Sequence, residues 1–103
     1  MGENEQRQIT ELLVNTSAAH NEFEQRELGG VYDLAWSGWY AAYLVEHGLG
    51  NLLGEAITAD QLAGLLAQYD IDYRAQQWPE GWPDYYTAKL MEWRTATRNQ
   101  PAS

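Results

Sequence analysis

WSGWYAAYLVEH, residues 36–47, has a near copy in WPDYYTAKLMEW, residues 82–93. Aligned without gaps, the two segments are identical at five of twelve positions, which are Trp36/Trp82, Tyr40/Tyr86, Ala42/Ala88, Leu44/Leu90 and Glu46/Glu92. In each copy the tryptophan, tyrosine and leucine recur at steps of four, which places them on one face of a helix. The repeated segment therefore predicts two amphipathic helices of similar design.

Two further helices are expected, one before each aromatic segment. In the first, over residues 3–28, Ile9, Leu13, Thr16, His20 and Phe23 follow one another at steps of three and four. The sequence LGG at residues 28–30 should end this helix, since glycine accepts the left-handed conformation favoured at helix C-termini.

The start of the other helix, predicted over residues 59–77, has the strongest local signal. Thr58 and Gln61 form a capping-box pattern, and Ile57 with Leu62 fits a hydrophobic staple. The leucine-bearing connector before it, GLGNLLGEA, is expected to pack on the core.

The aromatic helices are expected over residues 34–47 and 83–98. Asp33 or Ser37 is a suitable N-cap for the earlier one, and Pro83 suits the first position of the later one. No segment shows the sustained alternation of a β-strand.

These signals predict an all-α fold and a single domain over residues 1–103, arranged as a four-helix bundle of two helical hairpins. At an offset of 48, Ile9-Thr10 matches Ile57-Thr58 and Arg26 matches Arg74, which suggests an internal pseudo-repeat. Gene duplication and convergent packing demands both explain the similarity. In either case Trp36, Tyr40, Trp82 and Tyr86 are expected to meet near the hairpin bends.

Charge and composition exclude several classes of function. The chain carries 15 acidic residues against 6 Lys and Arg, a formal net charge of −9, and this field should repel nucleic acid and anionic membranes and attract a cationic partner. The apolar runs are too short to span a bilayer, and the N-terminal sequence MGENEQRQ does not resemble a secretory signal. We therefore expect a cytoplasmic protein with no nucleic-acid or membrane partner.

The strongest candidate for polar chemistry is the pair His20 and Glu24, which lie four residues apart on one helix face. Metal sites need three or four converging ligands and the chain has no cysteine, so neither a metal nor a cofactor is expected. No nucleophile elbow or phosphate-binding glycine loop occurs in a suitable context. Asp70 and Asp72 are interpreted as part of a solvated helix face.

The chain is rich in large aromatic side chains, with five Trp and seven Tyr. Four short helices cannot bury all of them. Trp39, Trp78 and Tyr85 lie off the predicted apolar stripes or in a turn, and are expected at the surface, where Trp and Tyr often form interfaces.

The segments AAHNEFEQRELGG and WSGWYAAYLVEHGL resemble small uncharacterised bacterial helical proteins. The shared pattern is Ala-His-x-x-aromatic-Glu followed by Trp-x-x-Trp-Tyr-Ala-x-Tyr-Leu, and it covers residues 19–48. This resemblance implies no known activity.

Two functional hypotheses follow. The leading one is a non-enzymatic interaction module that uses exposed Trp and Tyr to bind a protein partner or to self-associate, with a dimer as the expected form. The alternative is a small-molecule binding or catalytic domain. Its pocket would lie between the first two helices and would be formed by His20, Phe23, Glu24, Trp36 and Tyr40.

Overall fold

The computed structural model describes residues 2–30, 35–76 and 81–99, and these residues form five α-helices and no strand. The helices are α1 (Gly2–Glu27), α2 (Trp36–Glu46), α3 (Leu49–Leu53), α4 (Ala59–Gln76) and α5 (Trp82–Arg98). The all-α class expected from the sequence is confirmed. None of the described helices is both long enough and apolar enough to cross a bilayer.

Helix boundaries follow the local signals closely. At the end of α1, the backbone N–H groups of Leu28 and Gly30 donate to the carbonyl of Glu24, and Gly29 and Gly30 adopt φ of 61° and 84°. At the start of α4, the Thr58 N–H donates to Gln61 Oε1 and the Gln61 N–H donates to Thr58 Oγ1, each at 3.1 Å. The predicted capping box is therefore confirmed.

The start of α2 differs from expectation. Ala35 is the N-cap residue, no side chain caps the helix, and Ser37 lies inside it. Asp33, the other predicted cap, lies outside the described residues. The connector after α2 packs on the core as expected, but it does so as a short helix, α3, whose Leu49 and Leu53 are buried.

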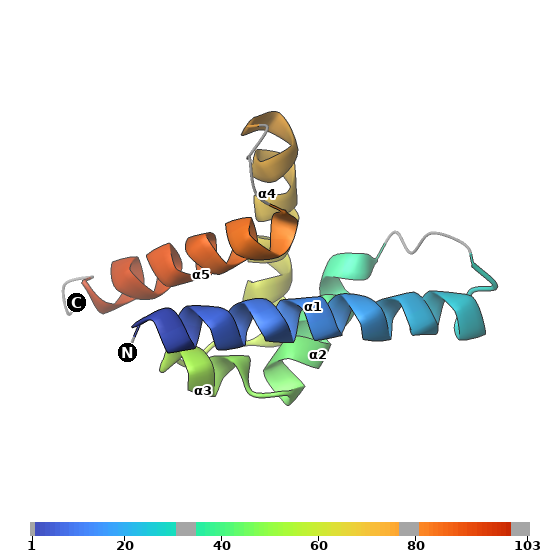
Figure 1. Cartoon of the computed structure of the whole chain (residues 1–103), viewed down its shortest axis with the longest axis horizontal. Helices are drawn as coiled ribbons and strands as arrows, with labels where there is room; N and C mark the ends of the chain where they lie inside the picture. Colours follow the sequence, from blue (N-terminus) through green and yellow to red (C-terminus); the bar gives the residue numbers. More distant parts are fainter. Residues whose placement is uncertain (1, 31–34, 77–80, 100–103) are drawn as a thin grey trace.

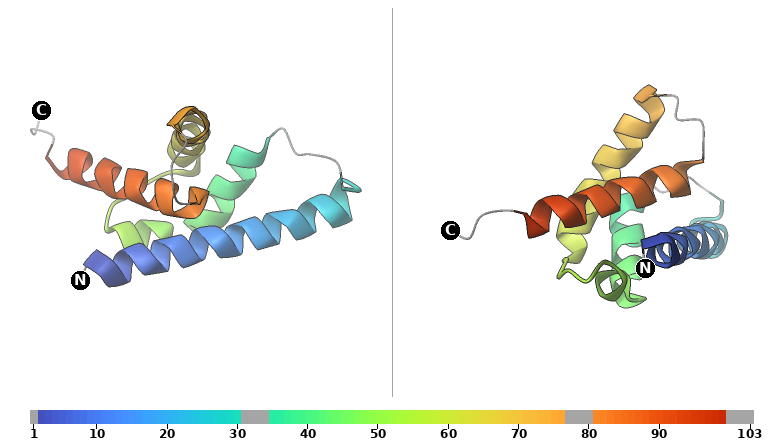
Figure 2. Two further views of the ribbon diagram at one scale, coloured as in Figure 1. Left: turned by 45° about the horizontal axis from the view of Figure 1, so that its top comes forward. Right: turned by 60° about the vertical axis from the view of Figure 1, so that its left-hand side comes forward.

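The helices do not share the common axis of a four-helix bundle. Helices α1 and α5 lie side by side and run in opposite directions, whereas α4 crosses them steeply (Figures 1 and 2). Helix α2 packs against both α1 and α4, and α4 packs against α5. Four of the helices thus form a closed ring of contacts, α1–α2–α4–α5, while α3 covers one end of the core.

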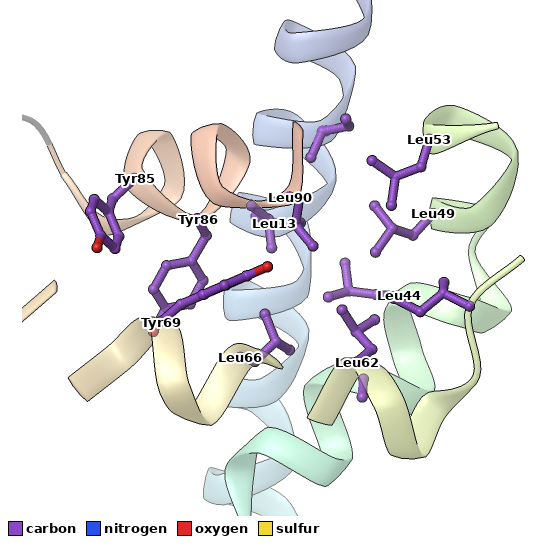
Figure 3. Packing of buried hydrophobic residues seen from close by; sticks show 13 residues of the cluster. Leu13, Leu44, Leu49, Leu53, Leu62, Leu66, Tyr69, Tyr85, Tyr86 and Leu90 are labelled. Atoms are coloured by element: carbon purple, nitrogen blue, oxygen red, sulfur yellow. The ribbon is translucent and has the colours of Figure 1, made fainter. Parts of the chain in front are cut away.

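The centre of this ring is filled by fully buried aliphatic side chains from all five helices (Figure 3). They are Ile9, Leu13, Leu44, Leu49, Leu53, Leu62, Leu66 and Leu90. Tyr69 of α4 and Tyr86 of α5 face each other beside them, with ring centroids 6.1 Å apart. Burial of these apolar side chains is the main driving force for the fold.

The two aromatic segments occupy similar positions in their helices. Helix α2 begins at Trp36 and α5 at the equivalent Trp82, and the leucine pair Leu44/Leu90 is fully buried in both. The offset-48 match is not reflected in helix boundaries, because Ile9 lies within α1 whereas Ile57 precedes α4.

Tyr85 corrects one sequence-based expectation. It was predicted to be exposed, but only 2% of its surface is accessible. Because α4 crosses α5 at this point, the ring of Tyr73 packs 5.6 Å from that of Tyr85, and Lys89 Nζ lies 5.7 Å from the Tyr85 ring centroid. Tyr85 is therefore a core residue and not an exposed one.

Candidate functional site

A pocket of about 240 Å³ lies where α1, α2, α4 and α5 converge. Each helix contributes two lining side chains, which are His20 and Glu24, Trp36 and Tyr40, Asp70 and Arg74, and Trp82 and Tyr86. The pocket therefore combines four aromatic rings with four ionisable side chains, a composition typical of sites for small ligands.

The aromatic wall is a continuous series of edge-to-face contacts that runs along α2 and on to α5. The rings of Trp36 and Tyr40 are 5.4 Å apart at an interplanar angle of 86°, and those of Trp82 and Tyr86 are 5.1 Å apart at 62°. Tyr40 also lies 6.2 Å from Trp82 and joins the two pairs. The expectation that these four aromatics meet is confirmed. The similar spacing of the two segments places a Trp–Tyr pair from each at the same pocket.

The polar wall contributed by α4 and α5 centres on Asp70. The Tyr86 hydroxyl donates to Asp70 Oδ1 at 3.3 Å, and Arg74 Nε lies 3.1 Å from Oδ2. The Asp70 side chain is 24% exposed, so its interpretation as part of a solvated face is wrong, whereas that of Arg74 is 71% exposed and lies at the rim. Burial, followed by the Asp70 charge, raises the pKa of Tyr86 well above its usual range and keeps the phenol neutral.

On the α1 side, His20 and Glu24 lie one helical turn apart, as their spacing predicts. His20 Nδ1 is 3.8 Å from Glu24 Oε1, and the His20 side chain is 7% exposed. Its ring lies 4.9 Å from Trp39, 5.0 Å from Tyr40 and 6.0 Å from Phe23. Contacts with α2 therefore fix the orientation of His20 at the pocket.

The sequence identified half of this pocket. His20, Glu24, Trp36 and Tyr40 line it, and Phe23 lies behind them, packed against His20. The second half was not assigned to the pocket, although Trp82 and Tyr86 were expected to meet Trp36 and Tyr40. The internal repeat is the signal that could have added Trp82 and Tyr86 to the pocket. Asp70 and Arg74 have no such signal, because their place depends on how α4 crosses the other helices.

Two further residues were predicted for an interaction surface, Trp39 and Trp78. Trp39 is half-buried and belongs to a row of rings along α1 and α2: it lies 5.5 Å from Phe23 and 5.5 Å from Tyr43, and Tyr43 in turn stacks 3.9 Å from His47. We call Phe23, Trp39, Tyr43 and His47 the ring row. Trp78 lies outside the described residues.

Other places in the described part of the chain offer less chemistry. No three His, Asp or Glu side chains within residues 2–30, 35–76 and 81–99 come close enough to hold a metal ion. A larger hollow of about 490 Å³ beside α3 has a single ionisable side chain in its lining, Glu55, which already pairs with Arg98 at 2.7 Å. The pocket at the helix junction is therefore the best candidate site.

Comparison with protein-family models, curated proteins and solved structures finds no match to this chain. The chemistry of the pocket is the remaining guide to function.

Proposed function

We propose that the protein binds a small organic molecule in the pocket formed by α1, α2, α4 and α5. The observation that carries this proposal is the convergence of two Trp–Tyr pairs with the ionisable pairs His20/Glu24 and Asp70/Arg74 around about 240 Å³. Ligand pockets generally combine apolar walls with a few placed polar groups, and this pocket has both.

The interactions of Asp70 and Tyr86 favour binding over catalysis. A catalytic site needs an acid, a base or a nucleophile within hydrogen-bond distance of a reacting atom. Both oxygens of Asp70 already interact with Tyr86 and Arg74, and Tyr86 is kept neutral by burial. These groups are suited to orienting a ligand, and we propose a non-enzymatic binding protein.

Ligand binding can be tested by a fragment screen monitored through the five tryptophan indole N–H signals in ¹H–¹⁵N NMR spectra. A fragment in the pocket should shift the signals of Trp36 and Trp82 and leave that of Trp93, near the other end of α5, unchanged. Failure of fragments of every charge class to shift the Trp36 and Trp82 signals would contradict the proposal.

A second candidate function, self-association, is supported by the ring row. Phe23, Trp39 and Tyr43 are half-buried and pack against one another in a row, and aromatic side chains of this kind are common at protein interfaces. Each copy carries a formal charge of −9, so a dimer formed through this surface should be stronger at high salt, where repulsion is screened.

Sedimentation at low and high salt tests the second candidate. We expect a dimer that is favoured by salt and lost in Trp39→Ala, with Trp93→Ala as a matched control because Trp93 lies outside the ring row. A monomer at high protein concentration under both conditions would remove this candidate and leave the pocket proposal intact.

A further inference from the structure

We infer that the pocket selects a small organic ammonium ion, held between aromatic faces and carboxylates. This inference rests on the proposed binding function and specifies its ligand class. It is carried by three features, which are the orientation of the rings, the charge of the pocket and the position of Arg74.

The aromatic wall has the form of a partial cage. Successive rings in the series Trp36, Tyr40, Trp82 and Tyr86 meet at angles between 62° and 86°, so their planes turn relative to one another. Faces of Trp and Tyr carry the negative end of the ring quadrupole and attract cations, above all alkylated ammonium groups, which are weakly hydrated. A purely stacked set of rings would instead suit a flat neutral ligand.

The charges around the pocket favour the same ligand. Glu24 and Asp70 contribute two negative charges and Arg74 one positive charge, so the lining has a net charge of −1 when His20 is neutral. The whole chain has 15 acidic residues against 6 Lys and Arg, which raises the local concentration of cations.

Arg74 indicates how a cation would enter. Its guanidinium pairs with Asp70, and the side chain is 71% exposed. The pocket thus already holds one cationic group against Asp70, and an exposed ion pair of this kind is easily exchanged for another. A ligand ammonium can take the place of the Arg74 head group, which then moves into solvent.

Arg74 also distinguishes a pocket that selects an ammonium ion from one that selects an organic anion. If the pocket instead selected an organic anion, Arg74 would be a ligand contact, and its removal would weaken binding. For an ammonium ligand, Arg74 is a competing like charge, and its removal should strengthen binding. Arg74→Gln is suited to this test because the side chain is exposed and contributes little to the core.

The experiment uses three probes of nearly the same shape and different charge: choline, the neutral 3,3-dimethylbutan-1-ol and the anionic 3,3-dimethylbutanoate. Binding is measured by NMR titration or calorimetry on the full chain. We expect choline to bind about tenfold more tightly than the neutral probe. Arg74→Gln should tighten choline binding by about threefold.

Two variants on α5 test the cage itself. Trp82→Ala should weaken choline binding about tenfold, whereas Trp93→Ala, outside the pocket, should not change it. Should Trp82→Ala fail to fold, the comparison of the three probes on the wild-type chain and on Arg74→Gln still decides the question.

The possible failures are distinguishable. Preference for the anionic probe, or weaker choline binding in Arg74→Gln, would overturn the ammonium inference while preserving a binding pocket. Equal affinity for all three probes would also overturn it, because shape alone would then explain binding. No binding of any probe, together with a negative fragment screen, would overturn the proposed function itself.

The trimethylammonium group of choline occurs both in free metabolites and in methylated lysine side chains. A peptide containing trimethyllysine distinguishes these sources: tighter binding than choline would assign the ligand to a protein side chain, and equal or weaker binding to a free molecule. Either result retains the ammonium class.

Discussion

The hydroxyl of Tyr86 on α5 donates a hydrogen bond of 3.3 Å to Asp70 Oδ1 on α4. The two residues belong to helices that cross steeply, and the bond links them at the edge of the pocket. It couples the packing of α4 on α5 to the position of the carboxylate that faces the proposed ligand.

Tyr86→Phe should lower the free energy of unfolding by about 1.5 kcal/mol, because it removes a hydrogen bond to a charged acceptor while keeping the buried ring. Urea denaturation followed by circular dichroism measures this change. A stability equal to that of the wild type would show that the bond does not contribute to the fold.

Alkaline pH should destabilise the protein through its buried tyrosines. Burial, and then the charge of Glu92, raises the pKa of Tyr69 to about 12, and the pKa of Tyr86 is also raised. As pH rises above about 10, the unfolded chain loses these protons while the folded chain keeps them. The free energy of unfolding should then fall by about 1.4 kcal/mol per pH unit for each tyrosine.

Urea denaturation at several pH values between about 8 and 11 tests this prediction. Tyr69→Phe should show a shallower decline above pH about 10 than the wild type, since one of the two tyrosine contributions is gone. Parallel declines in the free energy of unfolding of the variant and the wild type would contradict this prediction.

Thr58→Ala should destabilise the protein by about 1 kcal/mol, because it removes the acceptor for the Gln61 N–H in the capping box of α4. Thr95→Ala is a matched control. Thr95 is an exposed threonine inside α5 whose hydroxyl donates to the carbonyl of Met91 one turn back, so alanine there should be neutral or slightly stabilising. Equal losses in the two variants would contradict a specific role for the cap.

The ends of α1 and α5 are joined by an ion pair between Glu5 and Arg94. The hydrogen bond and the charge of Arg94 hold the pKa of Glu5 below its usual value. This ion pair therefore stabilises the fold at pH values above the usual pKa of glutamate. Its contribution is lost as the pH falls through the lowered pKa of Glu5.

An NMR titration of the Glu5 side-chain carboxyl should give a lower pKa in the wild type than in Arg94→Gln. Glu11, an exposed residue of the same helix, serves as the internal reference in both proteins. Identical Glu5 titration curves in the two proteins would show that the ion pair is not formed in solution.

The sequence by itself determined four of the five helices that the structure describes, together with one half of the pocket. Capping at Thr58, the glycines after α1 and the steps of three and four along each stripe are local features, and local hydrogen bonding fixes them wherever the helices finally pack. His20 and Glu24 come together for the same reason, since they are one turn apart on a single helix.

Only the tertiary structure decided the other half of the pocket. Periodicity shows which face of a helix is apolar, but it does not specify the neighbour or the crossing angle. The steep crossing of α4 buries Tyr85 against Tyr73 and brings Asp70 and Arg74 to the pocket. These contacts join residues far apart in the chain, and their geometry follows from how side chains of several helices fill one core.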